Sequence, residues 1–187
     1  MSSKISKNCL YITLQYLNQV NGQNKYHWGL FICETSNSSG VLLHASDNGR
    51  RNMDLRLEER QNAEPARSST MVVVLKIADS PGIDILRQCA ASVHLMDPRY
   101  LPQGENEWTC RVWVKEVLNS LHKYRYIELP MDVDSIEQHC QYMADSNIWY
   151  TGSAKVFNDL NWMTTSISST GTYSAPSASY GGSYYES

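Results

Sequence analysis

Two short apolar segments with a polar loop between them constrain the fold of this chain most strongly. Residues 26–33 (YHWGLFIC) and 41–46 (VLLHAS) have the length and composition of β-strands, and the loop ETSNSSG joins them. Such a pattern predicts an antiparallel β-hairpin. With the loop centred near residues 35–37, the position opposite His27 falls between residues 44 and 47. The hairpin therefore predicts that the imidazoles of His27 and His44 are neighbours.

Two further segments extend this hairpin into a sheet. Residues 9–17 (CLYITLQYL) alternate between apolar and polar side chains, and residues 70–78 (TMVVVLKIA) are rich in β-branched residues. Both patterns are typical of strands, and the second indicates a buried one. Residues 47–69 are polar and carry only weak signals of regular structure. The sequence predicts a mainly antiparallel sheet of four or more strands.

Three helices are expected after these strands. Ser80 followed by Pro81 is an N-cap and first-turn signature, and apolar residues then recur at helical spacing, which predicts a helix over 81–95. A second amphipathic helix begins near Cys110, and a third runs from a capping box at Asp134 and Glu137 to about residue 146. The fold class is therefore α+β, with helices packed on the sheet.

Composition and charge exclude several classes of protein. With 16 basic and 19 acidic residues, the formal charge is −3, which gives no electrostatic footprint for nucleic acid. The N-terminus lacks the pattern of a secretory signal, and no apolar run approaches the roughly 18 residues of a membrane span. The five cysteines are odd in number, widely spread and free of Cys-x-x-Cys pairs. A reducing compartment is expected, the cytoplasm in the first place, with no disulfide framework and no metal site.

The composition changes abruptly near residue 164. From there to residue 187 the chain consists mainly of Ser, Thr, Gly and Tyr, with almost no aliphatic side chain. Such a segment cannot bury enough apolar surface to offset the entropy of ordering. We expect one domain over residues 1–163 and a disordered tail over 164–187.

The residues with the clearest chemical potential are Cys110, His27 and His44. Cys110 lies in the first turn of its predicted helix, where the helix dipole favours a thiolate. A neighbouring imidazole can take the thiol proton, so His27 is the candidate base. His44 is the candidate group that orients His27, and Asp47 is the competing one. Any one of these residues alone would more often be a packing residue, but their combination indicates a site.

Aromatic residues flank this candidate site. Trp28, Trp108 and Trp113 are candidates for lining an apolar substrate cleft, although tryptophans at such spacing are more often core residues. The Cys110 amide at the helix start would stabilise an oxyanion, and the candidate second donor is Tyr11 or Tyr16 from the first strand. The other four cysteines fit a packing role.

The same segments resemble those of the permuted papain-like enzymes, which include NlpC-type peptidases and the lecithin retinol acyltransferase family. HWGLFI at 27–32 is similar to the first histidine strand of that acyltransferase family, LLHA at 42–45 to its second, and TCRVWV at 109–114 to its cysteine helix. The resemblance implies a circularly permuted papain-like fold in which His27 is the base, His44 the orienting group and Cys110 the nucleophile. The chain also resembles uncharacterised proteins of filamentous fungi as far as about residue 163.

These patterns predict a cysteine-dependent hydrolase or acyltransferase. It would act on an amide, ester or thioester of a small molecule or peptide through an acyl-enzyme on Cys110, and it would need no cofactor. The alternative is a binding module without catalytic activity that keeps the same scaffold. The sequence leaves the substrate, the acceptor and the oligomeric state open.

Overall fold

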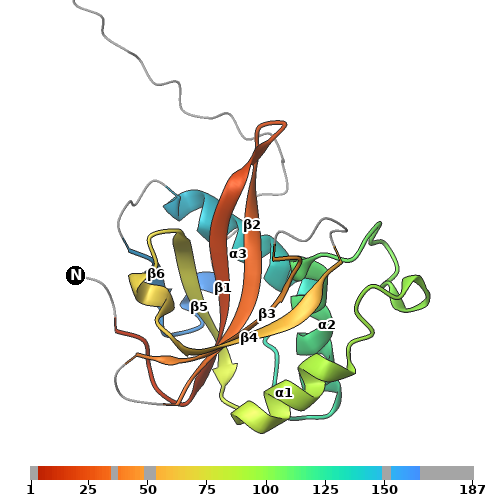
Figure 1. The fold of residues 1–187 in the computed structure, drawn as a ribbon. Coiled ribbons are helices and arrows are strands. Elements are labelled where there is room, and N and C mark those ends of the chain that lie inside the picture. Colours follow the sequence, from red (N-terminus) through yellow and green to blue (C-terminus); the bar gives the residue numbers. More distant parts are fainter. Residues whose placement is uncertain (1–3, 35–37, 49–53, 149–152, 165–187) are drawn as a thin grey trace, which may run out of the picture.

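The computed structural model describes residues 4–34, 38–48, 54–148 and 153–164, which form an α+β fold. The strands are β1 (Cys9–Val20), β2 (Gln23–Cys33), β3 (Gly40–Ser46), β4 (Arg56–Ala63), β5 (Met71–Asp79) and β6 (Lys155–Phe157). The α-helices are α1 (Ile83–Ser92), α2 (Cys110–Lys123) and α3 (Val133–Asn147), and short 3₁₀ helices lie at Pro65–Arg67, Pro98–Tyr100 and Asn161–Thr164. The six strands form one sheet in the order β4-β3-β2-β1-β5-β6 (Figure 1). All neighbouring strands are antiparallel except β5 and β6, which are parallel.

The β1–β2 hairpin is longer than the sequence pattern predicted. Its pairing runs from Cys9 opposite Cys33 to Val20 opposite Gln23, so both strands extend beyond the predicted ranges 9–17 and 26–33. The turn is Asn21-Gly22, and both residues have positive φ angles, 51° and 79°. This geometry is that of the two-residue turn that best matches strand twist, and Asn-Gly is its preferred sequence. The hairpin projects beyond the rest of the sheet in Figure 1.

Strand β4 occupies a segment for which no regular structure was predicted. It pairs along β3, with His44 opposite Glu58 and Ser46 opposite Arg56. An edge strand forms backbone pairs on one side and can keep charged side chains in solvent, which protects it from pairing with other chains. A search for apolar alternation therefore misses it.

Two helix starts differ from the predicted ones. Helix α1 begins at Ile83 after Gly82, whose φ is 88°, and Ser80 Oγ accepts a hydrogen bond from the Gly82 amide instead of capping the helix. Helix α3 is capped by Asp132, whose side chain accepts from the Ser135 amide at 2.8 Å, so the proposed capping box at Asp134 and Glu137 was wrong. The start of α2 at Cys110 was predicted correctly.

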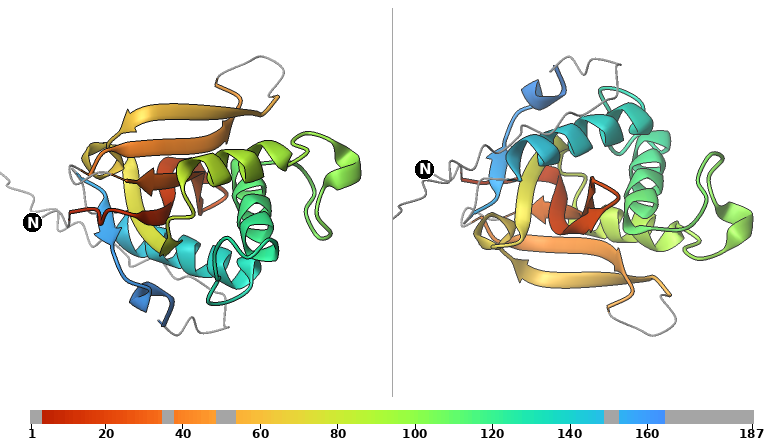
Figure 2. Two further views of the ribbon diagram at one scale, coloured as in Figure 1. Left: turned by 90° about the horizontal axis from the view of Figure 1, so that it is seen from below. Right: turned by 90° about the horizontal axis from the view of Figure 1, so that it is seen from above.

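The hydrophobic core lies on one face of the sheet. The three helices cover this face (Figure 2). Side chains that alternate along β1 and β2, such as Leu14, Trp28 and Leu30, pack there against α1, α2 and α3. A smaller apolar cluster on the opposite face contains Tyr11 and Phe31. Alternation therefore assigns each strand residue near the site to one of these faces.

Two further sequence expectations concern membranes and the tail. Within the described ranges, no helix is long and apolar enough to cross a membrane. The predicted disordered tail lies, apart from Thr164, outside the residues that the structure describes.

Candidate active site

Cys110 is the first residue of α2. The preceding Thr109 caps the helix, because its hydroxyl oxygen accepts a hydrogen bond from the Val112 amide at 3.2 Å. Amides in the first turn of a helix have no carbonyl partner within the helix, and the dipole makes this end favourable for negative charge. The Cys110 side chain is half-buried, whereas Cys9, Cys33, Cys89 and Cys140 are buried.

The sulfur of Cys110 lies against the backbone of β2 on both sides of His27. The Trp28 amide donates a hydrogen bond to Sγ at 3.4 Å, and the thiol is 3.9 Å from the Tyr26 carbonyl oxygen, to which it donates. Backbone bond lengths then place Sγ within roughly 6 Å of the His27 Cα. The described hydrogen bonds do not include a direct one between the Cys110 thiol and the His27 ring.

The Cys110 sulfur contacts the edge of β2 at a point where β2 is not paired with β3. Described pairing between these strands covers Leu30–Ile32 and Val41–Leu43. Helix α2 contacts both strands, and its first residue reaches the backbone groups of β2 next to this paired region. The separation of two neighbouring strands thus makes room for the helix start.

The two histidines of the predicted hairpin do meet. His27 Nε2 lies 2.6 Å from His44 Nδ1, and the rings are nearly perpendicular at 88°. By strand alternation both side chains lie on the sheet face opposite the helical core, since Trp28 and Leu43 occupy the core face. His27 is half-buried and His44 is buried. The contact occupies His27 Nε2, which leaves its Nδ1 as the ring nitrogen for proton transfer.

Both imidazoles are held in the neutral form. Burial lowers the pKa of His27, and the charge of Arg60 lowers it further, while Asp47 and Glu58 raise it. Burial, followed by the neighbouring His27 and Arg60, lowers the pKa of His44 to about 4. A neutral imidazole is the form that can accept a proton from a thiol.

The thiol of Cys110 differs from the expectation based on its helix. Burial raises its pKa above the ordinary value, and this outweighs the amides of Trp28, Arg111 and Cys110 and the charge of Arg111, which act in the opposite direction. The resting side chain is therefore a thiol at neutral pH. A nucleophilic role requires a base at the moment of attack.

The three tryptophans have different environments. Trp113 is fully buried and Trp28 is 3% exposed, and both belong to the core beneath the helices. Their side chains pack in that core, and the Trp28 backbone amide contributes the hydrogen bond to Cys110. Trp108 is half-buried, next to the cap of α2, and its indole N–H donates to the Asp97 carbonyl at 3.0 Å. Of the three, Trp108 is the one whose side chain keeps exposed surface beside Cys110.

The two tyrosines considered as oxyanion donors are separated by the sheet. Tyr11 is fully buried on the face opposite the helices, and its hydroxyl bonds Asn158 Oδ1 at 2.7 Å. It is opposite Phe31, four residues along β2 from His27, so the structure does not bring it to Cys110. Tyr16 is opposite Tyr26 on the helical face, with ring centroids 6.2 Å apart. Tyr16 therefore remains the candidate among the two.

Two carboxylates lie near the histidine pair. Asp47 follows β3, and its charge acts on His27. Glu58 of β4 is opposite His44 in the sheet, and its Oε2 is 4.0 Å from His44 Nε2. Glu58 was missed in the sequence because its strand was missed. The signal that would have found Glu58 is a carboxylate in the position directly opposite His44. Recognising that position requires knowing how β4 pairs with β3.

A charged network fixes the chain around the start of α2. Lys115 Nζ contacts Glu105 at 2.9 Å, Asp134 at 2.7 Å and Glu137 at 2.8 Å. Arg111, next to Cys110, bonds the same Glu105 and Glu137. These pairs tie the loop before α2 and the start of α3 to the helix that carries the thiol.

Comparison with known proteins gives one result. The model of the family of unknown function DUF6914 matches residues 7–157, which include Cys110, both histidines and Glu58. No curated protein and no solved structure matches the chain.

Proposed function

This chain belongs to DUF6914, a family of unknown function, and we propose that it is a cysteine-dependent hydrolase or acyltransferase. The observation that supports the proposal is the position of the Cys110 sulfur. Two hydrogen bonds hold it at the backbone groups that flank His27, whose ring is in turn fixed by His44 at 2.6 Å. Nucleophile, base and orienting group thus come from three separate elements.

The proposed reaction begins with a proton transfer. His27 Nδ1 accepts the proton of Cys110 while Sγ forms a bond to the carbonyl carbon of an amide, ester or thioester. The carbonyl oxygen becomes an oxyanion, which the Cys110 amide at the start of α2 stabilises, with Tyr16 as the candidate second donor. The His27 imidazolium then gives its proton to the leaving group. An acyl-enzyme on Cys110 remains.

The second half of the reaction releases the acyl group. Neutral His27 takes a proton from water or from another nucleophile, which attacks the thioester carbonyl. The bond to Sγ breaks, and the thiolate recovers its proton from His27. Whether water or another acceptor is used decides between hydrolysis and transfer.

The resemblance to permuted papain-like enzymes supports the proposal, because it implies the same roles for Cys110, His27 and His44. In this proposal the sheet and α2 form a circularly permuted papain-like core, and the protein acts in a reducing compartment such as the cytoplasm, where the five thiols remain free. The substrate is a small molecule or peptide with an acyl group, and Trp108 lies at its binding surface.

An activated ester tests the proposal. Incubation with p-nitrophenyl acetate should add one acetyl group to the peptide that contains Cys110. The variant Cys110→Ser should fold normally and form no thioester, while Cys89→Ser, which changes a buried thiol, should react like the wild type. No adduct on Cys110 under conditions in which the protein is folded would contradict the proposal.

The raised pKa of the Cys110 thiol favours a second candidate function, a binding module without catalytic activity. A thiol that stays protonated can be a packing residue in the wall of a binding surface. This alternative predicts that Cys110 reacts with electrophiles no faster than its exposure allows, and that its reaction does not depend on His27.

A further inference from the structure

His44 has one ring nitrogen whose hydrogen-bonding needs are not met. Its Nδ1 contacts His27, but its Nε2 is buried and has no hydrogen-bond partner within the described part of the chain. A buried polar atom without a partner costs about 1 to 3 kcal/mol. Oε2 of Glu58 lies 4.0 Å from this nitrogen, beyond hydrogen-bond distance.

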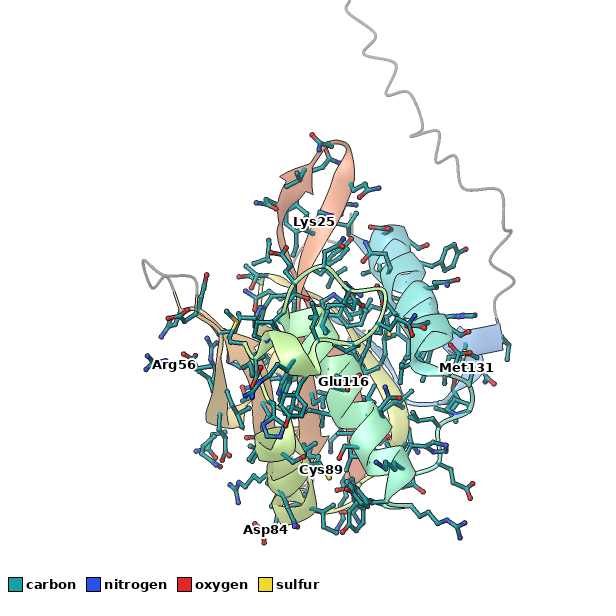
Figure 3. All side chains as sticks on the ribbon, turned by 90° about the vertical axis from the view of Figure 1, so that its right-hand side faces the viewer. Lys25, Arg56, Asp84, Cys89, Glu116 and Met131 are labelled. Carbon is teal, nitrogen blue, oxygen red and sulfur yellow. The ribbon has the colours of Figure 1, made fainter. Side chains whose placement is uncertain are left out.

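The register of the sheet sets this separation. His44 and Glu58 are direct partners across β3 and β4, so both side chains stand on the same face of the sheet. The Glu58 side chain is 21% exposed and its oxygen faces a buried nitrogen. A hydrogen bond between these atoms would be about 1 Å shorter than the observed contact. A change of rotamer in a glutamate side chain moves its oxygens by more than this distance. In Figure 3, Arg56 marks β4, at the outer edge of the sheet, two residues from Glu58.

The tautomers required by the proposed reaction determine which atom is the donor in the His27–His44 contact and in the His44–Glu58 contact. His27 must keep Nδ1 free of a proton in order to accept one from the thiol, so its proton resides on Nε2. That N–H donates to His44 Nδ1, which therefore acts as an acceptor. A neutral His44 then carries its own proton on Nε2, where it faces the Glu58 carboxylate.

We propose that Glu58 is a positioning residue that accepts a hydrogen bond from His44 Nε2 and thereby fixes the tautomers of both histidines. This inference rests on the proposed function, because it assigns the direction of the histidine contact from the role of His27 as base. Cys110, His27, His44 and Glu58 form a series that crosses α2, β2, β3 and β4. When His27 receives the thiol proton, the carboxylate stabilises the positive charge of the imidazole pair.

The charges around His44 are consistent with this role. His27 faces it from β2, while Arg60 and Glu58 face it from β4, and Asp47 acts on His27 from the end of β3. Arg60 opposes protonation of both rings, and Glu58 favours protonation of His27. Without Glu58, less negative charge would oppose the effect of Arg60, and protonation of His27 would become less favourable.

The neighbouring glutamate provides a matched control. Glu59 is the next residue of the same strand, and it pairs with Arg87 of α1 at 2.7 Å, on the other face of the sheet. Glu58→Gln and Glu59→Gln therefore remove the same charge from adjacent positions. Only the first is expected to act on the histidine pair.

The first readout is the tautomer of His44, measured by long-range ¹H–¹⁵N NMR on the full-length protein at pH 7.5. The wild type and Glu59→Gln should show the proton of His44 on Nε2. Glu58→Ala should show a mixture of tautomers, and Glu58→Gln, whose amide oxygen still accepts, should retain most of the wild-type form. This measurement needs no substrate, so it decides the proposal even if Cys110 forms no acyl adduct.

The second readout is the pH profile of acetylation by p-nitrophenyl acetate. Removal of the Glu58 charge lowers the pKa of His27, so the acid limb should move to lower pH in Glu58→Gln and stay in place in Glu59→Gln. Glu58→Ala should react roughly tenfold more slowly with KM unchanged, because a lost hydrogen bond of ordinary strength leaves less of His27 in the tautomer with an unprotonated Nδ1. An unchanged tautomer in Glu58→Ala would overturn the proposal, and so would an acid limb in Glu58→Gln that coincides with that of Glu59→Gln. A wild type without any adduct would instead refute the proposed function.

Discussion

His27 Nε2 lies 2.6 Å from His44 Nδ1, although the two residues are not direct partners in the sheet. The register of β2 and β3 pairs Leu30 with Leu43, and its continuation would place residue 46 opposite His27. The contact is therefore diagonal, and it forms where described pairing between the strands has ended. A pair at this distance accommodates one shared proton, because two imidazolium ions would repel each other.

The first prediction concerns stability at acid pH. The pKa of His44 is lowered to about 4 in the folded state, while it is about 6.5 in the unfolded chain. Between these values the unfolded state binds more protons, so stability should fall as the pH decreases from 6.5 towards 4. The shift corresponds to at most roughly 3 kcal/mol. Urea unfolding at pH 7.5, 6 and 5 measures it.

His44→Gln is the matched variant for this measurement. It should show a smaller loss of stability between pH 7.5 and 5 than the wild type. Some dependence remains, since the pKa of His27 is shifted in the same direction. Equal pH dependence in the two proteins would contradict the assignment of a neutral, buried His44.

The second prediction concerns Gly29, between His27 and the paired part of β2. A Cβ at this position would meet Thr13 Oγ1 and Leu42 Cδ1 at 3.0 Å and the Leu43 carbonyl oxygen at 3.2 Å. Gly29→Ala should destabilise the protein by about 1 to 3 kcal/mol, measured by thermal unfolding. It should also slow acetylation of Cys110. The added methyl group would push β3 away from β2, and this would move His44 away from His27.

Leu42→Ala in the Gly29→Ala background tests the cause. It removes one of the three contacts, so the double variant should lose less stability than the sum of the single ones. If the losses of stability in the two single variants added up in the double variant, the contact between the added methyl group and Leu42 would not be the cause of the destabilisation.

The third prediction concerns Lys115, which is 9% exposed and contacts three carboxylates. Lys115→Met leaves Glu105 and Glu137 partly buried with less positive charge, and should cost about 3 kcal/mol of unfolding free energy. Arg99→Met is the control, since Arg99 is 83% exposed in its pair with Asp97. It should change stability by less than about 1 kcal/mol. Equal effects in the two variants would show that the network contributes no more than a surface pair.

The fourth prediction concerns the reactivity of the thiols. Cys110 should be alkylated by iodoacetamide before the four buried cysteines, and its rate should still be rising at pH 9, because burial raises the pKa of this thiol. Peptide mapping after partial labelling measures both properties. A labelling rate that is already at its plateau at pH 7 would show that the thiolate is more stable than the structure indicates.

Local patterns were sufficient to predict much of this fold. Alternation and β-branched residues located β1, β2, β3 and β5, and the apolar stripe located α2. Strand β4 could not be found in this way, since seven of its eight residues are polar or exposed and it is held by the register of β3. The short β6 pairs with β5 from the far end of the chain, a contact that no local pattern contains.

The candidate site shows the same division. Hairpin geometry was enough to predict that His27 and His44 are close, because few residues separate their strands. Glu58 depends on an unrecognised strand, and the burial that raises the pKa of Cys110 depends on how α2 packs against β2. A helix dipole can be read from a sequence, whereas the desolvation that opposes it cannot.

The most direct test of the central claim is the rate of acetylation of Cys110 in wild type and His27→Ala at pH 7, measured by mass spectrometry of the Cys110 peptide. The thiol is mainly protonated at this pH, so attack depends on a base, and His27→Ala should react at least roughly 100-fold more slowly. At a pH well above the pKa of the thiol, the difference between the two proteins should shrink, because the thiolate then forms without assistance. Equal rates at pH 7 would contradict the account, since Cys110 would be reacting without the assistance that the proposal assigns to the His27 imidazole.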